Sequence, residues 1–238
     1  MNTFFLVLSG LSALSALLPV GVAYFRVNQY DRLLRIVAVY VLVALGFDFA
    51  MHLILAYMRA PGFQKSYPDL KLSNLPLAHV WVLTATLLLG RVYEMAFAHS
   101  KRLQQLARFG TILVGICTVA NTLPFKQWFD GLLNMPSKSL SIQSIFFLLL
   151  ALVYFYRLFT SDRPVINLER TGMFWVNSAV LIYFSINFLA FFLWNYMIKE
   201  GDGGAMSNGI HITINIIANL LFAAGLLCDS PQSQLTKV

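Results

Sequence analysis

Charged side chains are scarce in this sequence. Asp, Glu, Lys and Arg make up 11% of its 238 residues, whereas hydrophobic residues make up 58%. A soluble domain carries about 25% charged residues, so this deficit excludes a soluble globule and predicts a membrane protein with several spans. The net charge of +7 is scattered over short connections and forms no basic helix face or RNA-binding motif. We therefore expect no nucleic-acid partner.

Cysteine pairs and the common catalytic motifs are also missing. Of the two cysteines, Cys117 lies inside an apolar segment and Cys228 at the end of another, which argues against a structural disulfide. No CxxC or Cys/His zinc spacing occurs, and there is no P-loop, GxGxxG fingerprint or nucleophile elbow. The last apolar segment holds no lysine for a retinal Schiff base, which argues against a rhodopsin. The absence of repeats and of paired Gly/Pro-broken helices argues against a transporter.

Long apolar runs, in contrast, fill the chain. About 20 apolar residues in a helix cross the hydrocarbon core of a bilayer. Seven such segments lie at about 3–25, 35–58, 75–98, 108–124, 140–160, 172–198 and 207–228, of which the fourth is the shortest. The first is followed by Arg26 and has no basic region before it, so we interpret it as a retained helix and not as a signal peptide. The sequence predicts an all-α bundle of seven transmembrane helices as one domain, 1–228, with a short cytoplasmic tail, 229–238.

Lysine and arginine are divided unequally between the two sets of connections, and the richer side of a membrane protein is usually cytoplasmic. The richer set holds Arg26, Arg32, Arg35, Arg91, Lys101, Arg102, Arg108, Arg157, Arg163, Arg170 and Lys237. The poorer set holds Arg59, Lys65, Lys71, Lys126, Lys138 and Lys199. This bias predicts an outside N-terminus and a cytoplasmic C-terminus. Aromatic residues within 125–134 predict an interfacial belt or a short surface helix on the outer side.

An aspartate and a histidine interrupt the second apolar run, which extends from Ile36 to Met58. Asp48 and His52 are four residues apart and therefore share a helix face. An ionisable group at this depth is costly and is typical of a functional site. A hydrogen-bonded Asp48 with a structural role is the alternative. With the N-terminus outside, Asp48 lies slightly beyond the middle of its helix and His52 lies in the outer half.

Two other histidines are predicted at the outer side, whereas His99 falls in a basic cytoplasmic connection. His79 lies near the outer end of the third helix, and His211 near that of the last helix. His211, Asn215 and Asn219 form a polar stripe at spacings of four residues. If the second, third and seventh helices are neighbours, a ligand-binding pocket would be lined by Asp48, His52, His79, His211, Asn215 and Asn187. The asparagines have an alternative role, which is to join helices by hydrogen bonds.

Three chemistries fit this set of residues. The first is a ligand pocket open to the outside, in which Asp48 pairs with a cationic or hydroxylated group. The second is a proton-responsive pair of Asp48 and a histidine. The third is a zinc site of His52, His79, His211 and Asp48, because three imidazoles and a carboxylate match a catalytic zinc sphere. We assign no catalytic residue and no cofactor, and keep zinc as the alternative.

The zinc alternative is similar to the intramembrane hydrolases of the ceramidase and progestin-receptor type. Those proteins carry Ser-x3-His on an early helix and His-x3-His on the last helix. The corresponding spacings here are Asp48-x3-His52 and His211-x3-Asn215, so each motif is one ligand or nucleophile short. An enzyme is therefore the second interpretation, and a structural subunit of a membrane complex is the third.

A further charged pair lies near the inner end of the third helix. Arg91 and Glu94 are three residues apart, a spacing that allows an ion pair on a helix surface. An interfacial ion pair is the simpler interpretation, and a conformational latch that faces a partner is the alternative.

The sixth and seventh apolar segments carry a family resemblance. The stretch Phe174-Trp175-Val176-Asn177-Ser178, the stretch Tyr183-Phe184-Ser185-Ile186-Asn187 and the last helix resemble small bacterial seven-helix membrane proteins of sensory type. They also resemble the membrane part of bacterial seven-transmembrane receptors with intracellular signalling modules. The resemblance implies sensing or signalling in the bacterial inner membrane. This chain has neither a sensing domain nor a signalling module, so its output would pass through a partner, such as a histidine kinase, or through a homo-oligomer.

Overall fold

The computed structural model describes residues 3–59, 75–122, 137–160, 168–199 and 203–228. Within these ranges the chain is helical and contains no strand, which confirms the predicted all-α class. The long helices are α1 (Thr3–Arg26), α2 (Arg32–Arg59), α4 (Leu75–Ala96), α5 (Lys101–Thr122), α6 (Ser137–Thr160), α7 (Gly172–Lys199) and α8 (Gly203–Leu227). Two short 3-10 turns, η1 (Val27–Gln29) and η3 (Leu168–Arg170), precede α2 and α7.

Six of the described helices are long and apolar enough to cross a membrane, which indicates a multi-pass membrane protein. The helix outside this group is α4, whose C-terminal third carries Arg91 and Glu94. Helix α5 begins at Lys101, earlier than the predicted 108, because Lys, Arg, Gln and Leu in its first turns all favour helix. The predicted surface segment 125–134 and the tail 229–238 lie outside the described residues.

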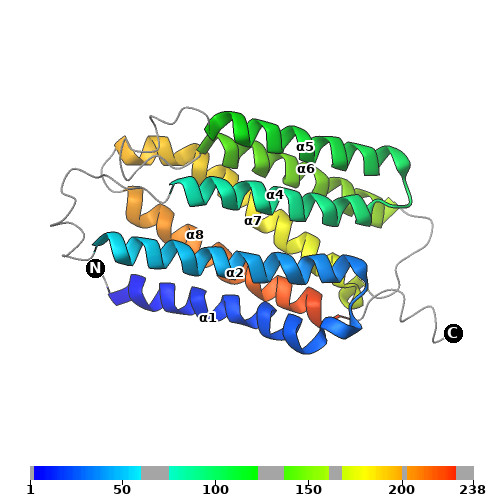
Figure 1. Ribbon diagram of the computed structural model, residues 1–238, viewed down its shortest axis with the longest axis horizontal. Coiled ribbons are helices and arrows are strands. Elements are labelled where there is room, and N and C mark those ends of the chain that lie inside the picture. The colour runs from blue at the N-terminus through cyan, green and yellow to red at the C-terminus, as the bar shows by residue number, and fades with distance from the viewer. Residues whose placement is uncertain (1–2, 60–74, 123–136, 161–167, 200–202, 229–238) are drawn as a thin grey trace.

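The helices run side by side along the long axis of the molecule (Figure 1). We call the end at which α1 begins the amino end, and the end at which α8 finishes the carboxyl end. Helix α8 packs mainly between α1 and α7, α7 packs on α6, and α4 packs on α2, α5 and α6. Helix α2 also touches α7 and α8. The predicted contacts of the second helix with the third and the last helix are therefore present, whereas α4 packs on α2, α5 and α6 and not on α8.

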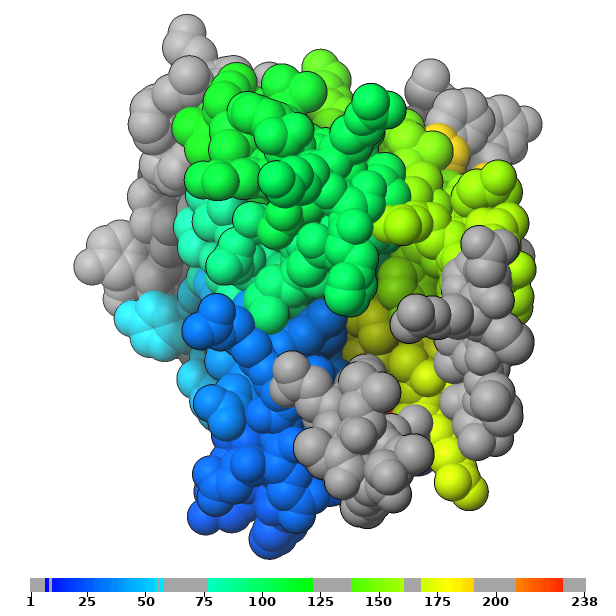
Figure 2. Space-filling view, turned by 90° about the vertical axis from the view of Figure 1, so that its right-hand side faces the viewer, coloured from blue at the N-terminus to red at the C-terminus, as the bar shows by residue number. Residues whose placement is uncertain are grey.

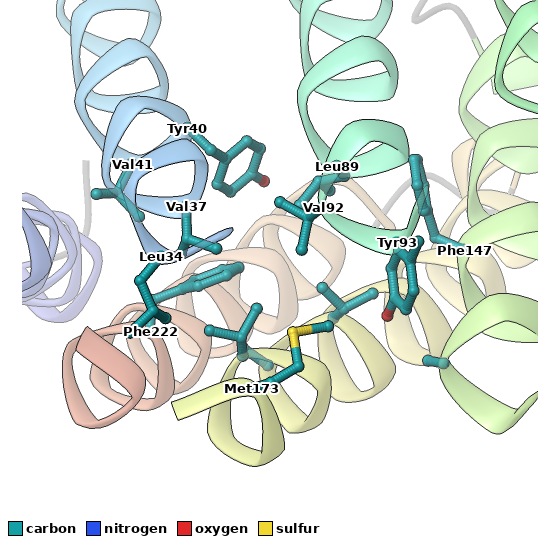
Figure 3. Packing of buried hydrophobic residues seen from close by; sticks show 14 of the residues in the cluster. Leu34, Val37, Tyr40, Val41, Leu89, Val92, Tyr93, Phe147, Met173 and Phe222 are labelled. Carbon is teal, nitrogen blue, oxygen red and sulfur yellow. The ribbon is translucent and has the colours of Figure 1, made fainter. Parts of the chain in front are cut away.

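The apolar core occupies the part of the bundle from about its middle to the carboxyl end. Figure 3 shows side chains of α2, α4, α6, α7 and α8 in this region, most of which point into the shared space, whereas Val41 points towards α1. They are Leu34, Val37, Tyr40 and Val41 of α2, Leu89, Val92 and Tyr93 of α4, Phe147 of α6, Met173 of α7 and Phe222 of α8. Tyr40 contacts both Trp81 and Phe222, with ring centroids 5.8 Å and 5.4 Å away. This packing fixes α2, α4 and α8 relative to one another.

The interior towards the amino end is polar instead. Ten polar side chains are buried among the described residues: Ser15, His79, Thr86, Thr111, Thr118, Ser139, Gln143, Ser144, Asn177 and Asn187. All except Asn177 lie from about the middle of the bundle to the amino end. Gln143 of α6 donates hydrogen bonds to the carbonyl oxygen of Val82 and to Thr86 Oγ1 on α4, at 3.1 Å and 2.9 Å. Hydrocarbon offers no such partners, so these polar groups must be satisfied inside the bundle.

One buried polar network crosses the apolar core. The hydroxyl of Tyr93 on α4 donates to Asn177 Oδ1 on α7 at 2.6 Å. Asn177 Nδ2 in turn donates to the carbonyl oxygen of Ala151 on α6 at 3.1 Å. Asn177 and Tyr93 are both 0% exposed. A single asparagine thus joins three helices at a depth where water cannot replace the lost hydrogen bonds.

Glycines allow the closest helix crossings. A Cβ atom at Gly172 would lie 2.6 Å from the backbone oxygen of Gly225, and one at Gly225 would lie 2.9 Å from that of Gly172. Helices α7 and α8 therefore meet backbone to backbone at the carboxyl end. A Cβ at Gly90 would similarly lie 2.1 Å from Thr111 Oγ1, where α4 crosses α5. Small residues at such crossings are typical of helix packing in membranes.

The described members of the richer set of basic residues, which exclude Arg163 and Lys237, lie towards the carboxyl end. Figure 2 looks onto this end, where the α1–α2 connection (blue) and the α4–α5 connection (green) face the viewer. Arg26 donates to the carbonyl oxygen of Leu227, so a cation lies at the negative end of the α8 dipole. Tyr30 donates to the carbonyl oxygen of Val22 at 3.1 Å. Burial raises the pKa of Tyr30, and the charge of Arg26 lowers it in part.

The ion pair predicted from the sequence is present near the same end. Arg91 Nη1 lies 2.6 Å from Glu94 Oε2, and the two side chains are 52% and 14% exposed. The two charges on α4 therefore compensate each other.

Candidate functional site

The helical register of α2 places Asp48 on the face that turns into the bundle. Positions 37, 41, 44 and 48 follow one another at three or four residues and so share a face. Val37 and Val41 on this face are 0% and 5% exposed, whereas the opposite face carries the exposed Phe49 and Leu42. In Figure 3, Val37 lies on the side of α2 near Phe222 of α8. Asp48 continues this inward face about 12 Å beyond Tyr40, towards the amino end.

The side chain of Asp48 is nevertheless exposed. Its side chain is 56% exposed, and that of His52, one turn further along, is 71% exposed. His52 Nδ1 lies 2.8 Å from the backbone oxygen of Asp48 and 3.5 Å from its carboxylate. Most described positions of α2 from residue 46 onwards are likewise exposed, so this part of the helix is only partly covered by its neighbours. We call the region between Asp48 and His52 of α2 and the facing residues of α7 and α8 the crevice.

The groups across the crevice are polar and connected. His211 of α8 lies with Nδ1 2.9 Å from Asn187 Oδ1 of α7, and its ring centroid is 6.4 Å from that of Tyr183. The carboxylate of Asp48 is close enough to act electrostatically on both His211 and Tyr183. His211, Asn187 and Tyr183 thus form one polar group between α7 and α8, and Asp48 of α2 lies within electrostatic range of it.

A small cavity adjoins Tyr183 and Asn187. It offers about 20 Å³ for the centre of a water molecule, and its lining comes from α2, α4, α6 and α7. This is room for about one water or one small polar group. The lining residues are Tyr40, Trp81, Ala85, Leu140, Gln143, Ser144, Tyr183, Phe184 and Asn187. Tyr183 and Asn187 belong to both the crevice and the cavity and thus connect them.

Asn187 has an unused hydrogen-bonding atom at this junction. The residue is 1% exposed, and its Nδ2 atom is buried without a hydrogen-bond partner among the described residues. The side chain of Tyr183 lies within reach of this amide, although no well-formed hydrogen bond joins it to Nδ2. An unpaired buried donor costs about 1–3 kcal/mol. A ligand or water in the cavity that supplies an acceptor would remove this cost.

The other predicted site residues lie elsewhere. His79 is buried on α4 with Nδ1 unpaired. It shares a helix face with Val82 and Thr86, the residues that Gln143 of α6 contacts. His79 thus faces α6, which is not the expected direction towards the last helix. Asn215 is half-buried on α8, and the next residue of the stripe, Asn219, donates to Ser15 of α1 at 3.0 Å. The polar stripe of α8 therefore forms hydrogen bonds with two neighbouring helices, with α7 through His211 and with α1 through Asn219.

The structure describes no metal-ligand set. In the described ranges, no group of three or more His, Cys, Asp or Glu residues lies close enough together to hold a metal ion. His79 and His52 belong to different surroundings, one facing α6 and one at the open end of α2. The zinc interpretation thus gains no support from these described residues.

Sequence reasoning missed several residues that line the cavity. Gln143 is one, and its only sequence signal is a polar stripe with Ser139, four residues earlier on an apolar helix. Tyr40 and Trp81 are others, since aromatic residues in apolar segments carry no signal of their own. Tyr183 was visible as one of the polar residues of the sixth segment but had no assigned partner.

Comparisons with protein-family models, with curated proteins and with solved structures found no match to this chain. The resemblance to bacterial seven-helix sensory proteins therefore rests on the motifs of the last two helices alone. The function must be argued from the site.

Proposed function

We propose that this chain is a small receptor-like protein that crosses the bacterial inner membrane seven times, with its N-terminus outside. The crevice around Asp48 would then open to the outside and bind a small polar ligand. The observation that carries the proposal is the exposed carboxylate of Asp48 on the inward face of α2, opposite His211 and Asn187. A charged group on such a face is stable only if water or a polar ligand reaches it.

The division of the bundle supports a role in signalling. Most of the buried polar side chains lie in the amino half, whereas the other half is filled by the apolar core. Helices α7 and α8 border the crevice and continue to the carboxyl end, where exposed basic residues such as Arg32, Lys101 and Arg102 favour a cytoplasmic location. A ligand-dependent movement of this helix pair would reach a signalling partner or a second copy of the chain.

Thiol accessibility tests the opening. In a variant with Cys117 and Cys228 replaced by serine, a cysteine at Asp48 should react at least about tenfold faster with a charged methanethiosulfonate reagent than a cysteine at Phe49, because reaction requires a thiolate in water. Phe49 is a matched control, since its side chain is exposed on the peripheral face. Val37→Cys, on the inward face but within the core, should not react.

The same reagent tests the orientation when it is applied to intact cells and to inside-out vesicles. The cysteine at position 48 should react in cells and be protected in vesicles. Equal, slow reaction at positions 48 and 49 would show that both face lipid, and the receptor proposal would then fail. Fast reaction from the cytoplasmic side alone would reverse the proposed orientation.

A further inference from the structure

The cavity between α2, α4, α6 and α7 has the properties of a site for one small polar molecule. Its room for the centre of a water molecule, about 20 Å³, exceeds the roughly 10–15 Å³ that one buried water needs. Six of the nine lining residues carry a polar group, namely Tyr40, Trp81, Gln143, Ser144, Tyr183 and Asn187. Cavities with polar walls hold water, whereas those lined only by apolar side chains stay dry.

One lining group requires a partner from within the cavity. Asn187 is 1% exposed, and its Oδ1 atom already pairs with His211 Nδ1 on α8 at 2.9 Å. This bond fixes the side-chain amide and leaves Nδ2, which is buried without a hydrogen-bond partner among the described residues, to the cavity. A buried donor without an acceptor is costly, so the molecule in the cavity must accept a hydrogen bond.

The charges of the lining indicate a neutral molecule. None of the described residues that line the cavity is Asp, Glu, Lys or Arg. An ion would therefore lose its hydration without gaining an opposite charge in return. The negative charge of Asp48 also acts on Tyr183 of the lining, which disfavours an anion further. A neutral acceptor of the size of water fits all three requirements.

We infer that one water molecule occupies this cavity as a permanent part of the fold and accepts a hydrogen bond from Asn187 Nδ2. A buried water makes about three hydrogen bonds, and the polar side chains around this one come from α2, α4, α6 and α7. The water thus joins α7 to its neighbouring helices at the point where the unpaired amide lies. It would be present whether or not the chain is a receptor, because only the cavity and the amide require it.

X-ray radiolysis of the full chain in lipid nanodiscs, followed by mass spectrometry, tests this inference. Radiolysis turns a bound water into a hydroxyl radical, which oxidises the side chains beside it. Tyr40 and Phe184 line the cavity and are only 7% and 4% exposed, whereas Tyr93 and Phe147 are 0% exposed and lie in the core away from it. Tyr40 and Phe184 should be oxidised at least about tenfold faster than the two core rings, because only they touch a bound water.

Two variants test whether the water occupies this cavity and is held by Asn187. Asn187→Leu removes the donor, and Ala85→Val narrows the cavity from the α4 side. Each should lower the oxidation of Tyr40 and Phe184 to the level of the core rings. Asn219→Leu is the matched control, because its amide bonds to Ser15 of α1 and does not line the cavity, and it should leave the oxidation unchanged.

Equal, slow oxidation of the cavity rings and the core rings in the unmodified chain would overturn the inference, since the cavity would then be dry. Fast oxidation that persists in either cavity variant would also overturn it, because the radicals would then come from a source other than a water held by Asn187. The first comparison needs no variant, so a misfolded variant does not obscure it. Thiol reactivity at position 48 tests the receptor proposal separately.

Discussion

Replacing Gly172 with alanine is expected to lower the free energy of unfolding by about 2 kcal/mol, within the range found for overpacked cores. The added Cβ would lie 2.6 Å from the backbone oxygen of Gly225 and 3.2 Å from Leu34 Cδ2. The first of these neighbours is backbone, which cannot move aside by changing a rotamer. Helices α7 and α8 must therefore separate, and the contacts on both sides of the crossing would weaken.

The measurement is unfolding in detergent micelles titrated with sodium dodecyl sulfate and followed by circular dichroism. Gly46→Ala provides a control of opposite sign, because nothing lies within 4 Å of its Cβ position. Removal of a helical glycine there should stabilise the protein by about 0.5–1 kcal/mol. A Gly172→Ala protein as stable as the unmodified chain would contradict the backbone contact.

The reciprocal substitution sharpens this test. A Cβ at Gly225 would meet Gly172 O and Val176 Cγ2, each at 2.9 Å. Gly225→Ala should therefore also destabilise the bundle. Because one separation of the two helices relieves both clashes, the double variant should lose less stability than the two single losses added together.

Breaking the hydrogen bond between Tyr93 and Asn177 is the second change with a large expected effect. Asn177→Leu keeps a similar volume. It leaves the buried Tyr93 hydroxyl without its acceptor and removes the hydrogen bond to the carbonyl oxygen of Ala151. The expected loss is about 2 kcal/mol, since an unsatisfied buried group costs about 1–3 kcal/mol. Tyr93→Phe alone should cost less, because it removes only one donor and Asn177 keeps its bond to Ala151.

A double-variant cycle isolates the bond itself. With both changes present, the Tyr93 hydroxyl is gone, and the double variant should be no less stable than Asn177→Leu alone. Asn219→Ala is the comparison, because its bond to Ser15 is only half-buried and should contribute about 0.6 kcal/mol, the average for such contacts in membranes. Additive losses from Tyr93→Phe and Asn177→Leu would show that the two side chains do not interact.

The helices follow closely from the sequence, because each apolar run is long and is interrupted by charged residues or by Pro and Gly. The level of Asp48 along its helix also follows, since the axial position depends only on residue count. The predicted grouping of His79 with His211 depended instead on how the helices pack against one another. It required α4 to face α8, and the order of helices around a bundle is set by tertiary packing that apolar runs of equal length do not encode.

The residues that line the cavity also could not be identified from local sequence patterns. Gln143 has partners on α4 that lie 61 and 57 positions away in the chain, and no local pattern identifies them. Asn187 was predicted as a site residue from its polarity alone, and its unpaired Nδ2 became apparent only with its neighbours in place. Asp48 was predicted to border an outer pocket; its side chain is exposed, and the pocket stays a prediction.

If the bundle transmits a signal as proposed, the crossing of Gly172 and Gly225 restricts the movements that it can use. Two helices in backbone contact cannot slide past each other without a clash at every intervening side chain, but they can rotate about the point of contact. That point lies at the carboxyl end, whereas the crevice lies at the other end of the same two helices. Ligand binding would then change the crossing angle between α7 and α8. A partner at the cytoplasmic face would detect this change of angle, and not a shift of either helix along its axis.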